Sequence, residues 1–120
     1  MRKTVSLYKH TSDGTTRHLW AEILENGDLL VSGHDLGKAP EAWWGDSDYE
    51  FWVSVQAHDK GAVRQALLAA HPGFSRVMMS DDDALLVLLE ARWGGNPSAV
   101  DDFRIFLAEN GVAGKFETWR

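Results

Sequence analysis

Cysteine is absent from this chain of 120 residues, and the absence removes several kinds of chemistry together. Disulfide bonds, thiolate zinc sites and cysteine nucleophiles are all excluded. Stability must therefore come from packing. A chain of this length is expected to form one domain, residues 1–120, and to bury roughly two thirds of the surface that the unfolded chain exposes.

Long hydrophobic runs are also lacking. The longest covers residues 84–89, whereas a helix that crosses a bilayer needs about 20 apolar residues. Residues 1–10 contain two early basic residues but no apolar stretch of the kind found in a secretory signal. We therefore expect a cytoplasmic protein that does not bind membranes.

Positive charge is scarce, because Lys and Arg number 12 against 18 Asp and Glu, which gives a formal net charge of −6. Direct binding to a nucleic-acid backbone requires clustered Lys and Arg that displace counterions. The sequence therefore predicts no direct nucleic-acid binding and favours a protein partner with a basic surface. Hydrophobic residues at 44% and charged residues at 25% are typical of a folded soluble domain rather than a disordered chain.

Alternating apolar and polar residues predict a hairpin at the start of the chain, between residues 3–10 and 17–24. Its turn contains Asp13-Gly14, a pair that readily adopts positive φ angles. The two strands are therefore expected to be antiparallel neighbours.

A second hairpin is predicted at Asn26-Gly27, which precedes the apolar residues 29–33. Asn-Gly is the preferred pair for a two-residue type I′ turn. A loop of that length would set Trp20 opposite Gly33, with the indole across the bare glycine backbone.

Residues 33–45 interrupt the strand pattern with three glycines and a proline. We expect a loop of about a dozen residues there, which is long enough to suggest a function. A fourth strand then begins near Asp48, and its alternate side chains belong to opposite faces. Those expected in the core are Tyr49, Phe51, Val53, Val55 and Ala57, and those on the other face are Asp48, Glu50, Trp52, Ser54 and Gln56.

Three helices are predicted in the second half of the chain, each with a start signal and a stop signal. They begin after Asp59, Ser80 and Asn96 and end near Pro72, Gly94 and Asn110. Pro97 is expected at the first position of the third helix, where its missing N–H is not needed. The aspartates at 81–83 suit the positive end of a helix dipole, and we favour this interpretation over a cation site.

Runs of strands followed by runs of helices predict an α+β fold rather than a parallel βαβ arrangement. Residues 112–120 can add a last strand, either at an edge of the sheet or within it. We expect an antiparallel sheet of four strands plus a C-terminal fifth strand, with three helices packed on one face.

Motifs of known enzyme chemistry are missing as well. The sequence has no GxSxG nucleophile elbow, no phosphate-binding glycine loop and no HxH or HExxH pair. The predicted registers place His10 and His34 on one face and His18 on the other, which disfavours a shared metal ion. We therefore predict no catalytic residue, no metal site and no cofactor.

One polar group supports an alternative of a different class, and it consists of His34, Asp35, Asp48 and Glu50. A carboxylate beside an imidazole can orient the imidazole as a base. Carboxylates two residues apart on a strand are about 7 Å apart, a spacing that suits acid and base roles. The alternative is a small enzyme or ligand-binding domain that uses residues 33–52, and the nearby aromatic residues keep carbohydrate binding open.

The segments ENGDLLVSGHDLG, GDSDYEFWVSV and FLAENGVAGKFETW occur in this order along the chain. With these segments the chain resembles a group of small single-domain bacterial proteins that have no established activity. The resemblance spans nearly the whole chain and implies a bacterial single-domain protein. It supplies no catalytic or binding residue.

Aromatic and acidic residues near the fourth strand predict the function that we favour. Exposed aromatic side chains are typical hot spots of protein interfaces, and carboxylates complement a cationic partner. We expect a non-enzymatic acidic binding protein, most concretely an immunity or inhibitor protein that neutralises a cationic toxin or nuclease. The predicted partner-binding residues are Trp43, Trp44, Asp46, Asp48, Glu50 and Trp52.

Two further interpretations stay open for the same residues. One is an anti-defence protein whose acidic face imitates a nucleic acid. The other is structural, because one or two of these tryptophans can belong to the core instead of the surface.

Overall fold

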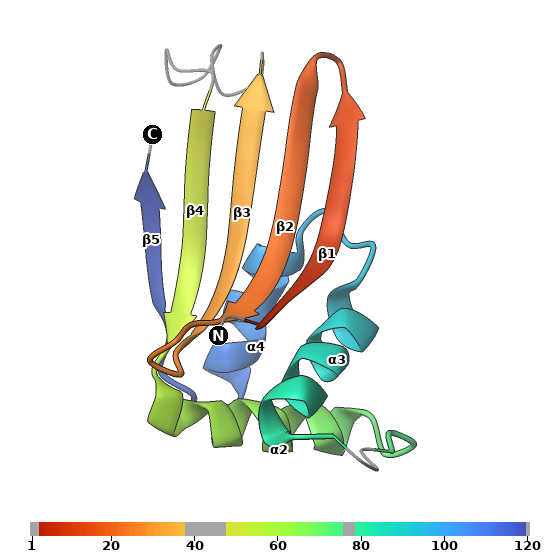
Figure 1. Ribbon diagram of the computed structural model, residues 1–120, viewed down its shortest axis with the longest axis vertical. Helices are drawn as coiled ribbons and strands as arrows, with labels where there is room; N and C mark the ends of the chain where they lie inside the picture. The colour runs from red at the N-terminus through yellow and green to blue at the C-terminus, as the bar shows by residue number, and fades with distance from the viewer. Residues whose placement is uncertain (1–2, 38–47, 76–78, 120) are drawn as a thin grey trace.

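Five antiparallel strands form one sheet, and three helices cover one of its faces (Figure 1). The structure is a computed structural model, and it describes residues 3–37, 48–75 and 79–119. The predicted α+β fold is confirmed. The elements are β1 (Lys3–Ser12), β2 (Thr15–Ile23), β3 (Leu29–Gly37), β4 (Asp48–Val55), the 3₁₀ turn η1 (Ala57–Asp59), α2 (Lys60–Ala70), α3 (Asp81–Trp93), α4 (Ala99–Glu109) and β5 (Lys115–Trp119).

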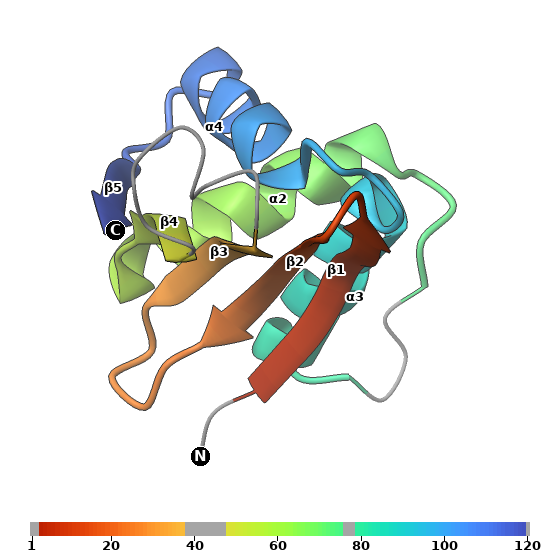
Figure 2. The same cartoon turned by 90° about the horizontal axis from the view of Figure 1, so that it is seen from above.

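The strands lie across the sheet in the order β1-β2-β3-β4-β5, so each pairs with its neighbour in the sequence. The C-terminal strand β5 is an edge strand, and its Phe116 lies opposite Val53 of β4. Seen from above, α2 and α4 lie on one side of β3 and β4 (Figure 2), while α3 packs against β1 and β2. Among the described residues, no helix has the length and apolar character needed to cross a membrane.

The core lies between the helices and the strand side chains that point toward them. Phe103 of α4 is fully buried, and Trp93 of α3 meets its ring edge-on, with 5.6 Å between the ring centroids. The predicted core face of β4 is largely confirmed, although Tyr49 is only partly buried and Ala57 is exposed in η1, after the strand has ended. The buried strand residues include Leu19, Ala21, Ile23, Leu29, Val31, Phe51, Val53 and Val55.

The first hairpin turns at Asp13 and Gly14 as predicted, with φ angles of 53° and 77°. Further along β1, a bulge at Leu7 shifts the pairing with β2. The carbonyl of Leu7 accepts a hydrogen bond of 2.7 Å from the Gly95 N–H, which follows α3. The bulge therefore joins the edge strand to the end of a helix.

The second hairpin does not turn in the predicted way, and its register is wrong by one residue. Leu24 N–H donates to the Asp28 carbonyl at 2.9 Å, so the loop contains residues 25–27 instead of two residues. Gly27 has a φ of 91°, and Asn26 Oδ1 accepts from the Asp28 N–H at 3.0 Å. A three-residue loop that ends in a left-handed glycine is a common alternative to the type I′ turn.

This shift changes the neighbours of Gly33. Leu19 lies opposite Gly33, and Trp20 lies opposite Ser32. A Cβ atom on Gly33 would stand 2.2 Å from Phe51 Cζ and 2.7 Å from Leu19 Cδ2. The glycine therefore makes room for core side chains on the helix side, and not for Trp20.

The predicted loop also begins too early, because β3 continues to Gly37. Residues 33–37 pair with β2 on one side, and part of this segment pairs with β4 on the other. Gly37 has a φ of 129°, and a Cβ atom there would lie 2.1 Å from the carbonyl oxygen of Gly14. These glycines thus permit close approach within the sheet. The rest of the predicted loop, residues 38–47, lies outside the described residues.

The starts of α2 and α4 differ from prediction in their capping. The Asp59 side chain makes no capping hydrogen bond, although α2 begins directly after it. Pro97 lies before α4, which begins at Ala99. Asn96 instead forms a turn, because its Oδ1 accepts from the Ser98 N–H at 2.8 Å.

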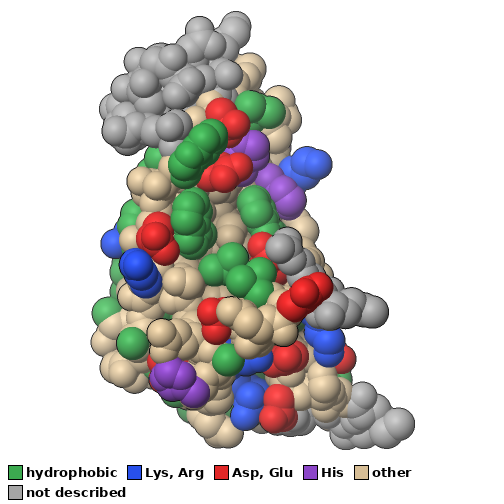
Figure 3. Space-filling model, turned by 60° about the vertical axis from the view of Figure 1, so that its left-hand side comes forward, with side chains coloured by type: hydrophobic (Ala, Val, Ile, Leu, Met, Phe, Trp, Pro, Cys, Tyr) green, Lys and Arg blue, Asp and Glu red, His purple; other side chains and the backbone are tan. Residues whose placement is uncertain are grey.

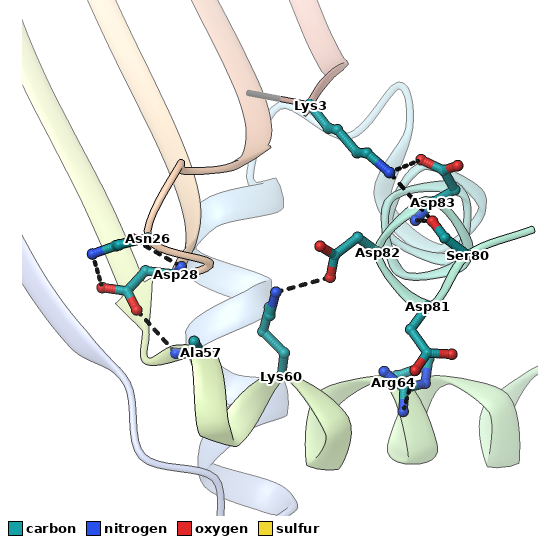
Figure 4. Close-up of polar contacts among 10 residues, drawn as sticks. All are labelled: Lys3, Asn26, Asp28, Ala57, Lys60, Arg64, Ser80, Asp81, Asp82 and Asp83. Carbon is teal, nitrogen blue, oxygen red and sulfur yellow. Dashed lines mark hydrogen bonds and ion pairs between the residues drawn. The ribbon is translucent and has the colours of Figure 1, made fainter. Parts of the chain in front are cut away.

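The three aspartates at the start of α3 have structural partners (Figure 4). Ser80 caps the helix as predicted, since its Oγ accepts from the Asp83 N–H at 3.1 Å. Each aspartate also faces a basic side chain of another element, which links α3 to β1 and α2. The pairs are Asp81 with Arg64 at 3.7 Å, Asp82 with Lys60 at 2.8 Å and Asp83 with Lys3 at 2.9 Å.

Candidate functional site

The sheet face opposite the helices carries a concentration of aromatic, acidic and histidine side chains (Figure 3). We call it the open face, because no described helix lies on it. Strand pairing arranges its central residues in two rows that run across all five strands. One row is Lys9, His18, His34, Glu50 and Trp119, and the other is Ser6, Trp20, Ser32, Trp52 and Glu117.

Tryptophans provide much of the apolar surface of the open face. Trp119, on the edge strand, is 57% exposed, and Trp20 and Trp52 are partly buried. Ser32 lies between Trp20 and Trp52 in the register and is only 6% exposed. This row therefore sets a small, buried residue between two large aromatic ones.

His34, Asp48 and Glu50 form the main polar group on the open face. His34 lies directly opposite Glu50 in the pairing of β3 with β4. His34 Nε2 is hydrogen-bonded to Asp48 Oδ1. One nitrogen of the imidazole and one oxygen of each carboxylate all lie within 4.8 Å of one another, and all three residues are partly buried.

Asp35 does not belong to this group, although the sequence placed it there. It lies on the helix side of the sheet and accepts hydrogen bonds from Arg17 Nε and Nη2, both at 2.7 Å. These hydrogen bonds raise the pKa of Arg17 above its ordinary value, against the opposite effect of burial. Arg17 also lies over the ring of Phe51, at 5.4 Å from its centroid. Because Asp35 and His34 are successive residues of β3 and point to opposite faces of the sheet, Asp35 cannot orient His34.

The predicted separation of the histidines is also wrong. His18 and His34 lie opposite each other on the open face, whereas His10 pairs with Arg17 and points to the other side. The His18 ring stacks on Trp20 with 4.9 Å between centroids and 32° between planes. Burial lowers the pKa of His18, with smaller contributions from Lys9 and His34. The folded state therefore favours the neutral form of His18.

The predicted partner-binding residues divide into two sets. Asp48, Glu50 and Trp52 lie on the open face of β4, as the alternation predicted. Trp43, Trp44 and Asp46 lie outside the described residues. The structure therefore brings three of the six candidates together on one surface.

Sequence reasoning missed Trp20, Trp119 and His18 as members of this surface. A signal for Trp20 was present, because it alternates with the buried residues Leu19 and Ala21 and so occupies a polar position of its strand. Trp52 was identified because it is a large aromatic residue on the otherwise polar face of β4. The same comparison of the two faces of β2 identifies Trp20. Trp119 required the position of β5, which the sequence left open.

Carboxylates outnumber amines on the open face. The acidic residues are Glu22, Asp48, Glu50 and Glu117, and the basic residues are Lys9 and Lys115. Lys115 is at the limit of an ion pair with Glu117, at 4.0 Å. The described residues of the open face therefore carry a net negative charge when the histidines are neutral.

Comparison of the chain with protein-family models, with curated proteins and with solved structures found no match.

Proposed function

We propose that the chain is a non-enzymatic bacterial binding protein that uses the open face to hold a protein partner with a basic surface. The observation that carries the proposal is the row of Trp20, Ser32 and Trp52 beside the acidic group of Asp48 and Glu50. Tryptophan is enriched among the residues that dominate binding energy at protein interfaces. Unbalanced carboxylates next to such residues favour a cationic partner and speed its association.

The most concrete role is that of a cytoplasmic immunity or inhibitor protein that neutralises a cationic toxin or nuclease. Such a protein needs a stable small scaffold and one local surface of high complementarity. The helices supply the scaffold on one side of the sheet, which leaves the strands' other side chains for recognition. The bacterial assignment comes from the resemblance of the chain to small bacterial proteins.

The proposal is tested by isolating the partner and measuring its affinity for matched variants. Trp52→Ala is expected to weaken binding by about 2 kcal/mol or more, roughly 30-fold, as removal of an interface hot spot does. Glu50→Lys should weaken binding strongly, and added salt should weaken the wild-type complex.

Helix-side controls are available for both variants. Ile105→Ala removes an apolar side chain that is 56% exposed, and Glu109→Lys makes the same charge change as Glu50→Lys. Both controls should bind like wild type. Equal losses in the controls and in the open-face variants would refute the proposal, as would an affinity that does not respond to salt.

The alternative of an enzyme or ligand-binding domain keeps partial support from the convergence of His34, Asp48 and Glu50. Its fourth group, Asp35, is on the other side of the sheet with Arg17. A hollow of about 270 Å³ is lined in part by Leu107 of α4, and it also lies on the helix side. The open face therefore supports recognition better than catalysis.

The nucleic-acid-mimic alternative requires carboxylates at phosphate-like spacing over a broad surface. On the open face, Glu50 instead lies opposite Trp119, and Trp52 is the next residue of β4 on the same face. This mixture favours a local interface with a protein.

A further inference from the structure

The polar group of the open face has the composition of a metal site. The pairing of β3 with β4 sets His34 opposite Glu50, and Asp48 lies two residues before Glu50 on the same face. Each residue offers one ligand atom, and these atoms lie within 4.8 Å of one another. Neighbouring strands hold the ligands, so their spacing is fixed by backbone hydrogen bonds rather than by a loop.

We infer that His34, Asp48 and Glu50 bind a divalent first-row transition-metal ion, of which Zn²⁺ is the representative. Imidazole nitrogen with carboxylate oxygen suits zinc and its neighbours, whereas calcium and magnesium prefer oxygen ligands alone. A metal bond to these atoms measures about 2.0–2.2 Å, so the ligands need only small side-chain movements to meet one ion. Three protein ligands leave a coordination position for water or for a group of another molecule.

The charges in the group support a cation. The hydrogen bond between His34 and Asp48 accounts for one carboxylate only. Glu50 forms no hydrogen bond or ion pair with another described residue. Two carboxylates beside one imidazole repel each other when both are ionised. A divalent ion would neutralise both, and His34 would bind it through a ring nitrogen that carries no proton.

The expectation of no metal site arose from a search for pairs of histidines. The ligand set found in the structure contains one histidine and two carboxylates, drawn from two strands. His18 of β2 lies opposite His34 of β3, but it does not belong to this set of metal ligands. Its substitution should therefore weaken metal binding less than that of His34.

The direct test is calorimetric titration of the metal-free protein with ZnCl₂. Wild type should bind one Zn²⁺ ion with saturation and should unfold at a higher temperature when the ion is present. Removing an outer-shell partner of a metal typically costs about 10- to 100-fold in affinity. His34→Ala and Glu50→Gln each remove a direct ligand, and each should lose at least that much.

A matched control is His58→Ala. His58 Nε2 lies 3.4 Å from Asp59 Oδ2, which is an imidazole beside one carboxylate without the third ligand. This variant should keep the wild-type affinity. The inference is overturned if wild type shows no saturable binding and no thermal shift, or if His34→Ala and Glu50→Gln bind like His58→Ala.

Glu50→Gln keeps the shape of the side chain. If His34→Ala does not fold, the Zn²⁺ affinity of Glu50→Gln therefore tests the metal site. The titration uses the isolated chain and no partner. Metal binding and partner binding can therefore fail independently of each other.

Discussion

Neighbouring residues of the same strand point to opposite faces of the sheet, and the two faces differ in burial and in chemistry. On the helix side, Leu19 and Ala21 of β2 are completely buried. Between them, Trp20 points to the open face, where it stacks with His18. One strand can therefore contribute both to the core and to an exposed binding surface, because successive side chains point to opposite faces of the sheet. The helix face should determine stability, and the open face should determine recognition.

The strongest test of this division replaces one aromatic residue on each side. Phe103→Ala removes a fully buried ring that packs edge-on against Trp93, and it should lower the free energy of unfolding by about 3–5 kcal/mol. Trp119→Ala removes a ring that is 57% exposed, and it should change stability by no more than about 0.5 kcal/mol. Urea denaturation measures both, and similar losses would break the comparison.

A smaller effect is expected from an added methyl group on the helix side. Gly33→Ala would place a Cβ atom 2.2 Å from Phe51 Cζ, and it should cost about 1–3 kcal/mol by overpacking. Gly73→Ala is the control, because a Cβ atom at Gly73 would meet nothing within 4 Å. Thermal or urea unfolding of the two variants should therefore differ clearly. Equal stability would mean that Phe51 moves freely and that the helix face is loosely packed.

The attachment of the helix layer gives a third comparison, between two serines. Ser80→Ala removes the Oγ that caps α3, and it should cost about 1 kcal/mol. Ser98 occupies the corresponding position of α4 but makes no side-chain capping bond, so Ser98→Ala should cost much less. Equal losses in denaturation experiments would show that the cap of α3 is not specific.

The smallest effect concerns pH and belongs to the open face. Burial holds the pKa of His18 below its ordinary value of 6.5, so the unfolded chain takes up a proton at a higher pH than the folded chain does. The contribution of His18 to stability is therefore complete above that value and declines as pH falls through the folded-state pKa. Urea denaturation between about pH 5 and pH 8 should show this slope, and His18→Gln should reduce it. An unchanged slope would indicate that His18 is fully solvated.

Local signals in the sequence predicted most of the fold. Asp13-Gly14 produced its expected turn, and Ser80 capped its helix, because both depend on residues close together in the chain. Asn26-Gly27 failed because the same pair also fits a three-residue loop with only the glycine in the left-handed region. The choice between the two loops depends on packing across the whole hairpin, where Leu19 has to fit beside Gly33.

The candidate site depended on this register more than the fold did. The predicted register of the second hairpin was wrong by one residue, so His18 and His34 were assigned to opposite faces of the sheet. The row that they form with Glu50 was therefore not predicted. The open-face position of Asp48 and Glu50 was nevertheless predictable, because alternation within β4 alone decides it. The contribution of Trp119 could not be predicted, since it depends on where β5 joins the sheet.

The most direct test of the central claim is a hydroxyl-radical footprint of aromatic and aliphatic side chains, measured by mass spectrometry in the free protein and in its complex with the isolated partner. Trp119 and Trp52 should react in the free protein and be protected in the complex, whereas Trp93, at 5% exposure, should react little in either state. Ile105 on the helix side should react equally in both. Protection of Ile105 with no change at Trp119 and Trp52 would contradict the assignment of recognition to the open face.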